Sequence, residues 1–350
     1  MEGDHIKINY WLMPLSWLYG LVVSIRNLMF DFGMLKSRSF DAPVICIGNI
    51  TVGGTGKTPH TEYLIRLLSR DKQVAVLSRG YKRKSRGYIL ANNDSTMEQI
   101  GDEPFQMKQK YPQIHMAVDK NRCHGIDQLM KPDVTPETEV ILLDDAYQHR
   151  HVKPGINILL MDYHRLTYFD KLLPAGRLRE PKSGIKRSDI VIVTKCPSYI
   201  TPMDKRGITR SLQIEYWQKI FFTTYRYPKT IEGLGEKPLL VTGIASPQQM
   251  VYDLQKIIPD FEVMSFPDHH NFSQKDIENI KQKAAGRTII TTEKDATRLK
   301  GLDNMKTIPI EVEFMDDQGK EFDSIIQSYV LKNSRNSILN KLKNKKKKNV

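Results

Sequence analysis

The segment at residues 48–59, G-N-I-T-V-G-G-T-G-K-T-P, restricts the fold of this chain more than any other. An apolar run, Val44–Ile47, precedes it, and a helical pattern at Thr58–Ser69 follows it. A strand, a glycine-rich loop and a helix in this order let backbone N–H groups bind a phosphate at the start of the helix. The sequence therefore predicts a phosphate-binding loop, although Thr51 stands where the usual pattern has its first glycine.

Further short apolar runs recur along the chain, and each ends in polar or glycine-rich residues. Because these runs are rich in β-branched residues and alternate with helical patterns, we expect an α/β fold, P-loop NTPase-like, with a largely parallel sheet. Ligands collect at the carboxyl ends of the strands in such sheets, so the polar residues just after each run are candidate site residues. The runs are Val74–Leu77, Val140–Leu143, Ile156–Met161, Ile190–Val193, Leu239–Val241 and Thr288–Thr291.

The chain of 350 residues is long enough for two packed domains. Residues 198–237 contain F-F-T-T-Y-R-Y and then a stretch with glycine and proline, which we interpret as the crossing into a second, smaller α/β domain. Four parts are expected, namely an N-terminal helix region at 1–36, a phosphate-loop domain at 37–205, the smaller domain with its crossing at 206–331, and a basic tail at 332–350.

The formal net charge of +13 resembles that of a nucleic-acid-binding protein, but its distribution does not. Eight of the basic residues lie between Lys332 and Val350, where no acid occurs, so the rest of the chain carries only +5. Such a block of like charge is typical of a solvated tail. Because the body of the chain shows no basic stripe interleaved with aromatic residues, we expect no nucleic-acid partner. Three scattered cysteines indicate a reducing compartment.

The N-terminal run Trp11–Ile25 carries no charge and is interrupted by Arg26. It is shorter than the roughly 20 apolar residues that a membrane-spanning helix needs. A buried helix and a helix lying in a membrane interface, with tryptophan and tyrosine at headgroup depth, both fit this segment. The residues alone leave these two alternatives open.

The loop residues have the chemistry of a nucleotide site. Glycines at 53, 54 and 56 carry no Cβ, so their N–H groups can close around phosphate oxygens. Lys57 supplies a charge for the β- and γ-phosphates, and the Thr58 hydroxyl can bind Mg²⁺. The residues predicted to bind ATP are Thr51, Val52, Gly53, Gly54, Thr55, Gly56, Lys57 and Thr58.

Asp144 and Asp145 come directly after the apolar run at Val140–Leu143. Two aspartates in this position are often only a turn or a helix cap. Phosphate-loop enzymes, however, hold Mg²⁺ with an aspartate at the end of an apolar strand. Since the loop is present in the same chain, we predict that these two carboxylates belong to a metal site.

Asp102 and Glu103 precede Pro104, which is typical of the first turn of a helix. An acidic N-cap is the commoner role of such residues. The helix dipole also keeps a carboxylate there ionised, so that it can accept a proton from a substrate hydroxyl at neutral pH. We therefore treat Asp102 as a candidate general base.

Two further segments carry candidate site residues. L-P-A-G-R-L-R-E-P at 173–181 contains Arg177, Arg179 and Glu180, and arginine suits a fixed phosphate on a substrate. F-P-D-H-H-N-F at 266–272 places His269 directly after an aspartate, an arrangement that is more often a loop histidine with a satisfied hydrogen bond.

Seven sequence words occur in an order that resembles the tetraacyldisaccharide 4′-kinases, also called lipid A 4′-kinases. They span about Trp11 to Leu299, and a loop without the first glycine is typical of this family. Three departures are Tyr147, where phenylalanine is common, the basic residues that follow Tyr81, and the lysine-rich tail, which is no part of the family pattern. The words are G-N-I-T-V-G-G-T-G-K-T-P, S-R-G-Y, G-D-E-P, D-D-A-Y-Q-H-R, L-P-A-G-R-L-R-E-P, F-P-D-H-H and T-E-K-D-A.

The resemblance implies transfer of the γ-phosphoryl group of Mg·ATP to the 4′-hydroxyl of tetraacyldisaccharide 1-phosphate at the cytoplasmic face of the inner membrane. It favours a membrane-associating helix over a buried one at residues 1–36. It implies that Asp102 is the base and that His269 tunes it. Glu180 would lie in the metal or ATP region, and Glu103, Tyr81, Arg177 and Arg179 near the substrate.

Two other classes of function compete with this interpretation. A soluble phosphate-loop kinase or ligase acting on a small metabolite would share the loop but would need no apolar N-terminal run. A nucleotide switch or nucleic-acid-binding protein is supported only by the basic tail.

Overall fold

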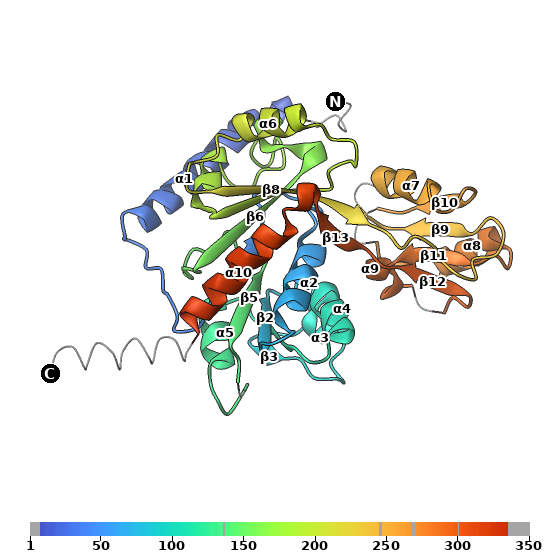
Figure 1. Cartoon of the computed structure of the whole chain (residues 1–350), viewed down its shortest axis with the longest axis horizontal. Helices are drawn as coiled ribbons and strands as arrows, with labels where there is room; N and C mark the ends of the chain where they lie inside the picture. The colour runs from blue at the N-terminus through green and yellow to red at the C-terminus, as the bar shows by residue number, and fades with distance from the viewer. Residues whose placement is uncertain (1–7, 136, 245–246, 268–269, 300, 335–350) are drawn as a thin grey trace. The chain divides into compact units, whose positions relative to one another are not determined.

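The computed structural model describes residues 8–334 except 136, 245–246, 268–269 and 300. The chain divides into two compact units, which are described separately (Figure 1). Unit 1 consists of Met1–Thr224 and Phe314–Val350, and unit 2 of Tyr225–Glu313.

Unit 1 is built on a nine-stranded sheet with the strand order β13-β8-β7-β6-β1-β5-β2-β4-β3, although the last two residues of β8 and the first three of β13 fall within unit 2. β1 pairs in parallel with β5 on one side and with β6 on the other. Parallel pairing continues outward through β2 and β4 and through β7 and β8, whereas β3 is antiparallel to β4. The strands are β1 Val44–Gly48, β2 Val74–Ser78, β3 Ile89–Leu90, β4 His115–Val118, β5 Val140–Asp144, β6 Ile156–Asp162, β7 Ile190–Thr194, β8 Lys219–Arg226 and β13 Glu311–Phe314.

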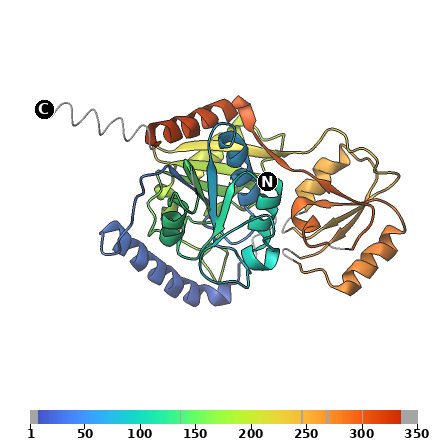
Figure 2. The same ribbon diagram turned by 90° about the horizontal axis from the view of Figure 1, so that it is seen from below.

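Helices cover both faces of this sheet, and α10 and α1 lie on opposite sides of unit 1 (Figure 2). On the α10 side, Tyr63 of α2 donates a hydrogen bond to Asp323 of α10 (2.8 Å), and its ring contacts Phe322. The helices are α1 Met13–Asp31, α2 Lys57–Leu68, α3 Met97–Ile100, α4 Asp102–Lys110, α5 Arg122–Leu129, α6 Pro202–Ser211 and α10 Gly319–Asn333; the 3₁₀ helices are η1 Tyr10–Leu12, η2 Tyr163–Arg165, η3 Thr167–Phe169, η4 Lys182–Arg187 and η5 Met315–Asp317.

The central strands are buried on both faces, as expected for a parallel sheet between helices. In β1 the side chains alternate, so that Val44 and Cys46 join the cluster that contains Ile126 and Leu129 of α5. Because both faces are covered, these strands appear in the sequence as continuous apolar runs rather than alternating ones. This burial explains why the apolar runs could be recognised from the sequence.

Unit 2 contains a four-stranded parallel sheet in the order β10-β9-β11-β12. Its T-E-K-D-A word has a structural function, because buried Asp295 accepts hydrogen bonds from the Gly243 N–H (2.9 Å) and the Thr292 hydroxyl (2.8 Å). These bonds join the ends of β9 and β11. The elements are β9 Leu239–Thr242, α7 Gln248–Gln255, β10 Glu262–Ser265, α8 Gln274–Ala284, β11 Ile289–Thr292, α9 Glu293–Ala296 and β12 Met305–Ile308.

The predicted α/β fold class with a largely parallel sheet and a second, smaller α/β part is confirmed. Each of the seven apolar runs is a strand whose ends lie within a residue of the predicted ones. The unit boundaries differ from the expected 206–331, since F-F-T-T-Y-R-Y lies mostly in β8, which extends the large sheet beside β7. Local alternation cannot tell which sheet a strand joins.

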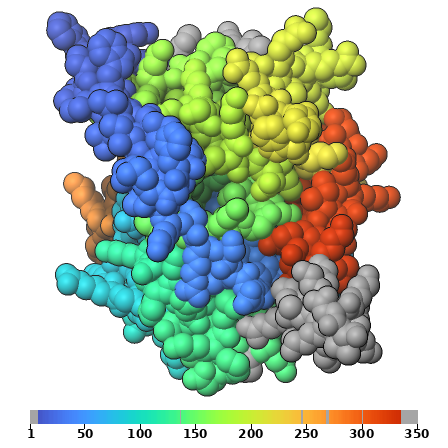
Figure 3. All heavy atoms as spheres, turned by 90° about the vertical axis from the view of Figure 1, so that its left-hand side faces the viewer, coloured from blue at the N-terminus to red at the C-terminus, as the bar shows by residue number. Residues whose placement is uncertain are grey.

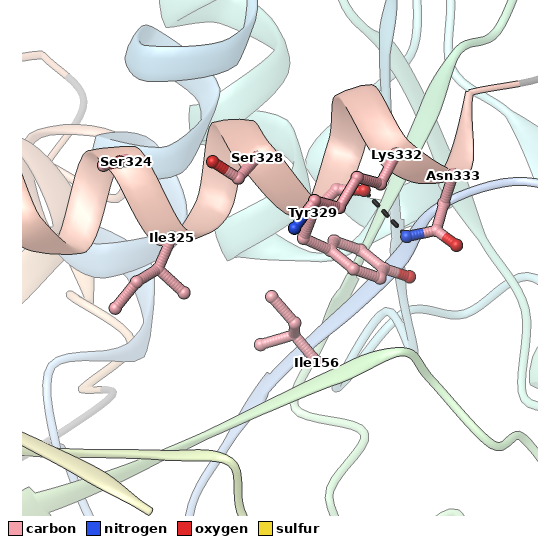
Figure 4. A pocket seen from close by; sticks show the side chains of 7 residues that line it. All are labelled: Ile156, Ser324, Ile325, Ser328, Tyr329, Lys332 and Asn333. Carbon is pink, nitrogen blue, oxygen red and sulfur yellow. Dashed lines mark hydrogen bonds between the residues drawn. The ribbon is translucent and has the colours of Figure 1, made fainter. Parts of the chain in front are cut away.

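α10 anchors the amino end of β1 through a phenol. Tyr329 accepts a hydrogen bond from the Val44 N–H (3.1 Å) and donates one to the Val44 carbonyl (3.2 Å). The same ring lines a cavity of about 430 Å³ beside Ile156, the first residue of β6 (Figure 4). This cavity therefore lies at the amino ends of the central strands, whereas the phosphate-binding loop lies at their carboxyl ends.

Tyr329→Phe should lower the free energy of unfolding by about 1–2 kcal/mol, because the buried Val44 N–H loses its acceptor. Chemical denaturation of the purified protein measures this change. The matched control is Tyr216→Phe, since Tyr216 is 95 % exposed, and it should leave stability unchanged. Equal stability of the two variants would contradict the anchoring function.

Candidate active site

The phosphate-binding loop lies between β1 and α2, as the sequence predicts. α2 begins at Lys57, directly after Gly56, which has a left-handed conformation (φ 84°) that favours glycine. Gly53 also has a positive φ (122°). The loop therefore ends at a helix N-terminus, where unpaired N–H groups and the helix dipole favour an anion.

The first half of the loop is held as a short β ladder. The Val52 N–H donates to the Arg177 carbonyl (2.8 Å), and the Arg179 N–H donates to the Ile50 carbonyl (2.8 Å). Thr51 is buried between them and forms an antiparallel bridge with Leu178. The position that lacks the usual glycine is thus part of an extended pairing that any side chain can adopt.

This ladder brings L-P-A-G-R-L-R-E-P beside G-N-I-T-V-G-G-T-G-K-T-P. Arg179 extends from it to the carboxylate of Asp145 (3.3 Å). The Arg177 guanidinium lies about 4.0 Å from the place that a Cβ on Gly53 would occupy. Both arginines predicted to contact a substrate phosphate are therefore adjacent to the loop.

Two carboxylates lie at the end of β5, next to the loop strand β1. Asp144 is buried and accepts hydrogen bonds from Ser78 (3.0 Å) and Thr61 (3.4 Å). Asp145 follows with a left-handed backbone and forms ion pairs with Lys57 (3.7 Å) and Arg179 (3.3 Å). Thr58 is one turn before Thr61 on the same side of α2, so its hydroxyl faces the same region.

The two aspartates have opposite electrostatic character. Burial raises the pKa of Asp144 to about 7, and the neighbouring charges of Glu103 and Asp145 add to this effect. Burial also acts on Asp145, but the Lys57 and Arg179 cations outweigh it and lower the pKa of Asp145. For Asp144 the nearby Lys57 cation does not outweigh burial and the two neighbouring carboxylates, whereas for Asp145 two cations do.

The predicted base lies at a helix start. α4 begins at Asp102, whose carboxylate accepts a hydrogen bond from the Glu103 N–H (3.0 Å). S-R-G-Y and G-D-E-P contact each other through their glycines, since a Cβ on Gly101 would lie 2.9 Å from the Tyr81 carbonyl. The charge of Glu103 acts on Asp144, so this helix start belongs to the same region as the two aspartates.

Glu180 is buried and forms an ion pair with Arg187 (2.8 Å). Asn27 of α1 also donates to it (3.4 Å). Its predicted metal or ATP function stays a prediction. Among the residues that the structure describes, no group of three or more histidine, cysteine, aspartate or glutamate side chains is placed to hold a metal ion.

His269 lies outside the described residues, so its pairing with Asp102 stays a prediction. Its neighbour His270 is described. The His270 ring stacks on Phe266, with 4.9 Å between ring centroids, and its Nε2 lies 3.1 Å from the carboxylate of Asp276. His270 therefore already has a carboxylate partner within unit 2.

Sequence reasoning missed three side chains that hold the loop: His60, Thr194 and Lys195. Lys195 donates to the Gly54 carbonyl, and Thr194 donates to the Thr55 carbonyl (2.9 Å). The His60 ring contacts the Gly56 carbonyl (2.8 Å). A signal existed for two of them, because Thr194 and Lys195 come directly after the apolar run Ile190–Val193.

The fold and this site define a phosphate-loop nucleotide-binding protein. Residues 8–330 match the family model described as Tetraacyldisaccharide-1-P 4′-kinase. The chain therefore belongs to the tetraacyldisaccharide-1-phosphate 4′-kinase family, and it is a kinase.

Proteins similar to this chain match it over nearly the whole length of both sequences. The chain is 55 % identical to a tetraacyldisaccharide 4′-kinase of Phocaeicola vulgatus, with 96 % of this chain and 99 % of the relative covered. It is 43 % identical to the Porphyromonas gingivalis protein of the same name, with 91 % and 96 % covered. A crystal structure of LpxK from Aquifex aeolicus in complex with ATP is similar with a TM-score of 0.71 and 30 % identity, covering 91 % of this chain and 98 % of that one.

Asp144 should make the stability of the nucleotide-free protein depend on pH. Its pKa is raised in the folded state, so its contribution is fully present below about pH 4 and is lost as the pH rises toward 7. Asp144→Asn should therefore match the wild type near pH 4 and become more stable than it by up to about 4 kcal/mol at pH 8. Unfolding curves at both pH values test this, and parallel behaviour of the two proteins across that range would contradict it.

Proposed function

We propose that this protein transfers the γ-phosphoryl group of ATP to the 4′-hydroxyl of tetraacyldisaccharide 1-phosphate in lipid A biosynthesis. The observation that carries the proposal is the adjacency of a phosphate-binding loop, two strand-end aspartates and an acidic helix start at one edge of the sheet. Family membership supports the acceptor, because relatives that match nearly the whole chain are named for it.

The loop is suited to the phosphates of ATP. Its N–H groups and the start of α2 attract the negative charge, and the Lys57 ammonium lies beside it. Lys57 pairs with Asp145 at 3.7 Å, a separation that leaves this ion pair weak enough to yield to a phosphate. Phosphoryl transfer depends mainly on such positioning and charge stabilisation.

Mg²⁺ fits the residues beside the loop. Thr58, Asp144 and Asp145 offer one hydroxyl and two carboxylates, and proteins usually hold Mg²⁺ with one or two carboxylates together with phosphate oxygens and water. The buried Asp144 carboxylate, whose pKa is raised to about 7 by burial, gains a compensating charge when a cation is present. The ion, when bound, neutralises charge on the β- and γ-phosphates. Glu180 would contribute from the adjacent segment.

Asp102 is suited to accept the proton of the sugar hydroxyl. The dipole of α4 favours its ionised form, and the helix start holds the short side chain in place. Glu103 and Tyr81 flank it, and Arg177 and Arg179 offer guanidinium groups for the 1-phosphate of the acceptor. His269 would complete the base.

Asp102→Asn should lower kcat about 10²–10⁴-fold while ATP binding changes little, because the amide keeps the shape but cannot take a proton. Transfer of labelled phosphate from ATP to purified lipid A disaccharide 1-phosphate measures this. Asp204→Asn is a matched control, since Asp204 likewise lies in the first turn of a helix, α6, where it caps the helix with Thr201. A wild-type kcat in the Asp102 variant would leave Asp102 as a plain helix cap.

The double variant Asp102→Asn/His269→Ala separates a joint function from independent ones. If the two residues act as one unit, the double variant should be scarcely slower than the poorer single variant. Fully additive losses would mean that they act separately. The same assay of kcat on the labelled lipid gives the answer.

The N-terminal helix supports membrane association. Among the described residues, Tyr10–Asp31 is the one stretch of helix long and apolar enough to cross a membrane by length and composition. The helix continues past Arg26, so it is longer than the uncharged run. Its buried residues Ser16, Gly20, Val23 and Phe30 form a narrow stripe.

Most of the exposed side chains of α1 are apolar. Leu18 and Val22 of α1 are each 59 % exposed, and Trp11 of η1, just before the helix, is 94 % exposed. Figure 3 shows this helix in blue, lying along the outside of unit 1. We infer that this side lies in the interface of the inner membrane on its cytoplasmic face, where ATP and the lipid acceptor meet. A soluble enzyme acting on a small metabolite would gain nothing from such a surface.

Deleting α1 would not be a clean test of membrane binding, because the helix also supports the active-site segment. Ser16 donates to the Leu172 carbonyl (2.7 Å), and Tyr19 donates to the Arg179 carbonyl (2.8 Å). A change limited to the exposed side avoids this problem.

Leu18→Glu/Val22→Glu should move the protein from the membrane to the soluble fraction by about tenfold or more, since two apolar anchors become charged. The KM for the lipid should rise while the affinity for ATP stays unchanged. Sedimentation with vesicles of anionic phospholipid measures the first effect, and Tyr216→Glu is the control on an exposed aromatic residue away from α1. Unchanged sedimentation would exclude this side of the helix as the membrane contact.

A further inference from the structure

Four consecutive carbonyl oxygens of the phosphate-binding loop, from Gly53 to Gly56, accept hydrogen bonds. The Gly53 carbonyl accepts from the Thr55 N–H (3.0 Å). The Gly54 carbonyl accepts from Lys195 and the Thr55 carbonyl from Thr194 (2.9 Å), two residues that follow β7. The Gly56 carbonyl accepts from the first turn of α2, through the ring (2.8 Å) and the backbone N–H (3.3 Å) of His60. Carbonyl oxygens carry partial negative charge, so each one that is turned to a donor is one that does not repel an incoming phosphate.

Peptide geometry converts these contacts into an orientation of the N–H groups. In a planar trans peptide, the carbonyl and the following N–H point in opposite directions. Holding the Thr55 carbonyl therefore aims the Gly56 N–H away from Thr194. Holding the Gly56 carbonyl likewise aims the Lys57 N–H away from His60. These two N–H groups lie where the loop enters α2, the position at which a phosphate binds.

Lys195 has an unfavourable backbone conformation and a shielded ion pair. It follows β7 directly and has a left-handed backbone (φ 56°), which is uncommon for a residue with a side chain and typically marks a functional position. Its ammonium also pairs with Asp162 at the end of β6 (2.7 Å). The lysine side chain is only 16 % exposed and the aspartate side chain 10 % exposed, so the pair is largely removed from solvent.

We propose that Lys195, Thr194 and His60 form a carbonyl clamp that preorganises the loop for the phosphates of ATP, with Lys195 as its main positioning residue. The clamp acts on the loop backbone rather than on the nucleotide. The proposal of a clamp rests on the proposed function only because it takes ATP as the ligand. A loop held in its binding geometry loses less conformational entropy on binding, so the clamp should contribute to ATP affinity.

Lys195→Met alone would leave Asp162 buried without its cation, which can destabilise the fold. The informative variant is therefore Lys195→Met/Asp162→Asn, which removes both charges and still keeps the asparagine oxygen that accepts the His164 N–H (3.0 Å). Asp162→Asn alone keeps the ammonium on the Gly54 carbonyl and separates the ion pair from the loop contact.

The matched control is Lys205→Met. Lys205 lies in α6 of the same unit, its side chain is 11 % exposed, and it forms an ion pair with Asp316 (2.7 Å). In the part of the chain that the structure describes, Lys205 forms no hydrogen bond with the loop, so this variant reports the effect of losing a shielded lysine that does not hold a loop carbonyl.

The experiment measures the Kd of Mg·ATP for the full-length protein in detergent micelles, together with the KM values for ATP and for the lipid acceptor. We expect Lys195→Met/Asp162→Asn to weaken ATP binding about tenfold or more and to raise the KM for ATP, with the KM for lipid unchanged. Asp162→Asn alone and Lys205→Met should bind ATP nearly as the wild type does.

Wild-type ATP affinity in Lys195→Met/Asp162→Asn would overturn the proposal, as would an equal rise in both KM values, because a general loss of structure affects both substrates. Failure of the proposed function gives a different result. In that case the wild type would bind ATP without phosphorylating the lipid, and the difference in ATP affinity between the variants would persist.

Discussion

The backbone pairing between Ile50–Val52 and Arg177–Arg179 is the constraint on which the rest of the active site depends. Two hydrogen bonds of 2.8 Å hold the start of the phosphate-binding loop to a segment that is distant in sequence. This segment delivers Arg179 to Asp145, and it also receives α1 through Tyr19. The nucleotide loop, a strand-end aspartate and the apolar N-terminal helix are thus connected through one short ladder.

The connection has a consequence for an enzyme of lipids. α1 contacts the ladder segment through Tyr19 and the nearby Leu172 through Ser16, while exposed apolar side chains lie elsewhere on the helix. Under the proposed membrane contact of α1, a helix that also supports the active-site segment would place the phosphate donor site at a fixed depth from the lipid surface. Seating of the helix and order of the loop are then coupled through direct hydrogen bonds rather than through long-range effects.

Charge compensation is the second organising feature of the site. Asp145 is neutralised by Lys57 and Arg179, so its pKa is lowered despite its burial. Asp144 accepts hydrogen bonds from the Ser78 and Thr61 hydroxyls, and its pKa is raised to about 7 because burial disfavours its charged form more than the Lys57 cation favours it. The site therefore contains one satisfied carboxylate and one that is costly to ionise without a cation. This asymmetry suits a site that acquires positive charge together with its nucleotide.

The sequence by itself determined the elements and the chemistry. Strands buried on both faces must be continuous apolar runs, so β1, β5 and β7 could be located to within a residue. The loop glycines and Lys57 identify a phosphate site, because few other sequence patterns serve that chemistry. Only the tertiary structure decided what surrounds the loop. The pairing of Thr51 with Leu178, the contact of Gly101 with Tyr81, the place of β8 in the large sheet and the hold of Lys195 on Gly54 all join residues far apart in the chain. Local sequence patterns record which backbone conformation a segment favours, but such contacts are fixed by the packing of whole strands and helices, and no short segment contains that information.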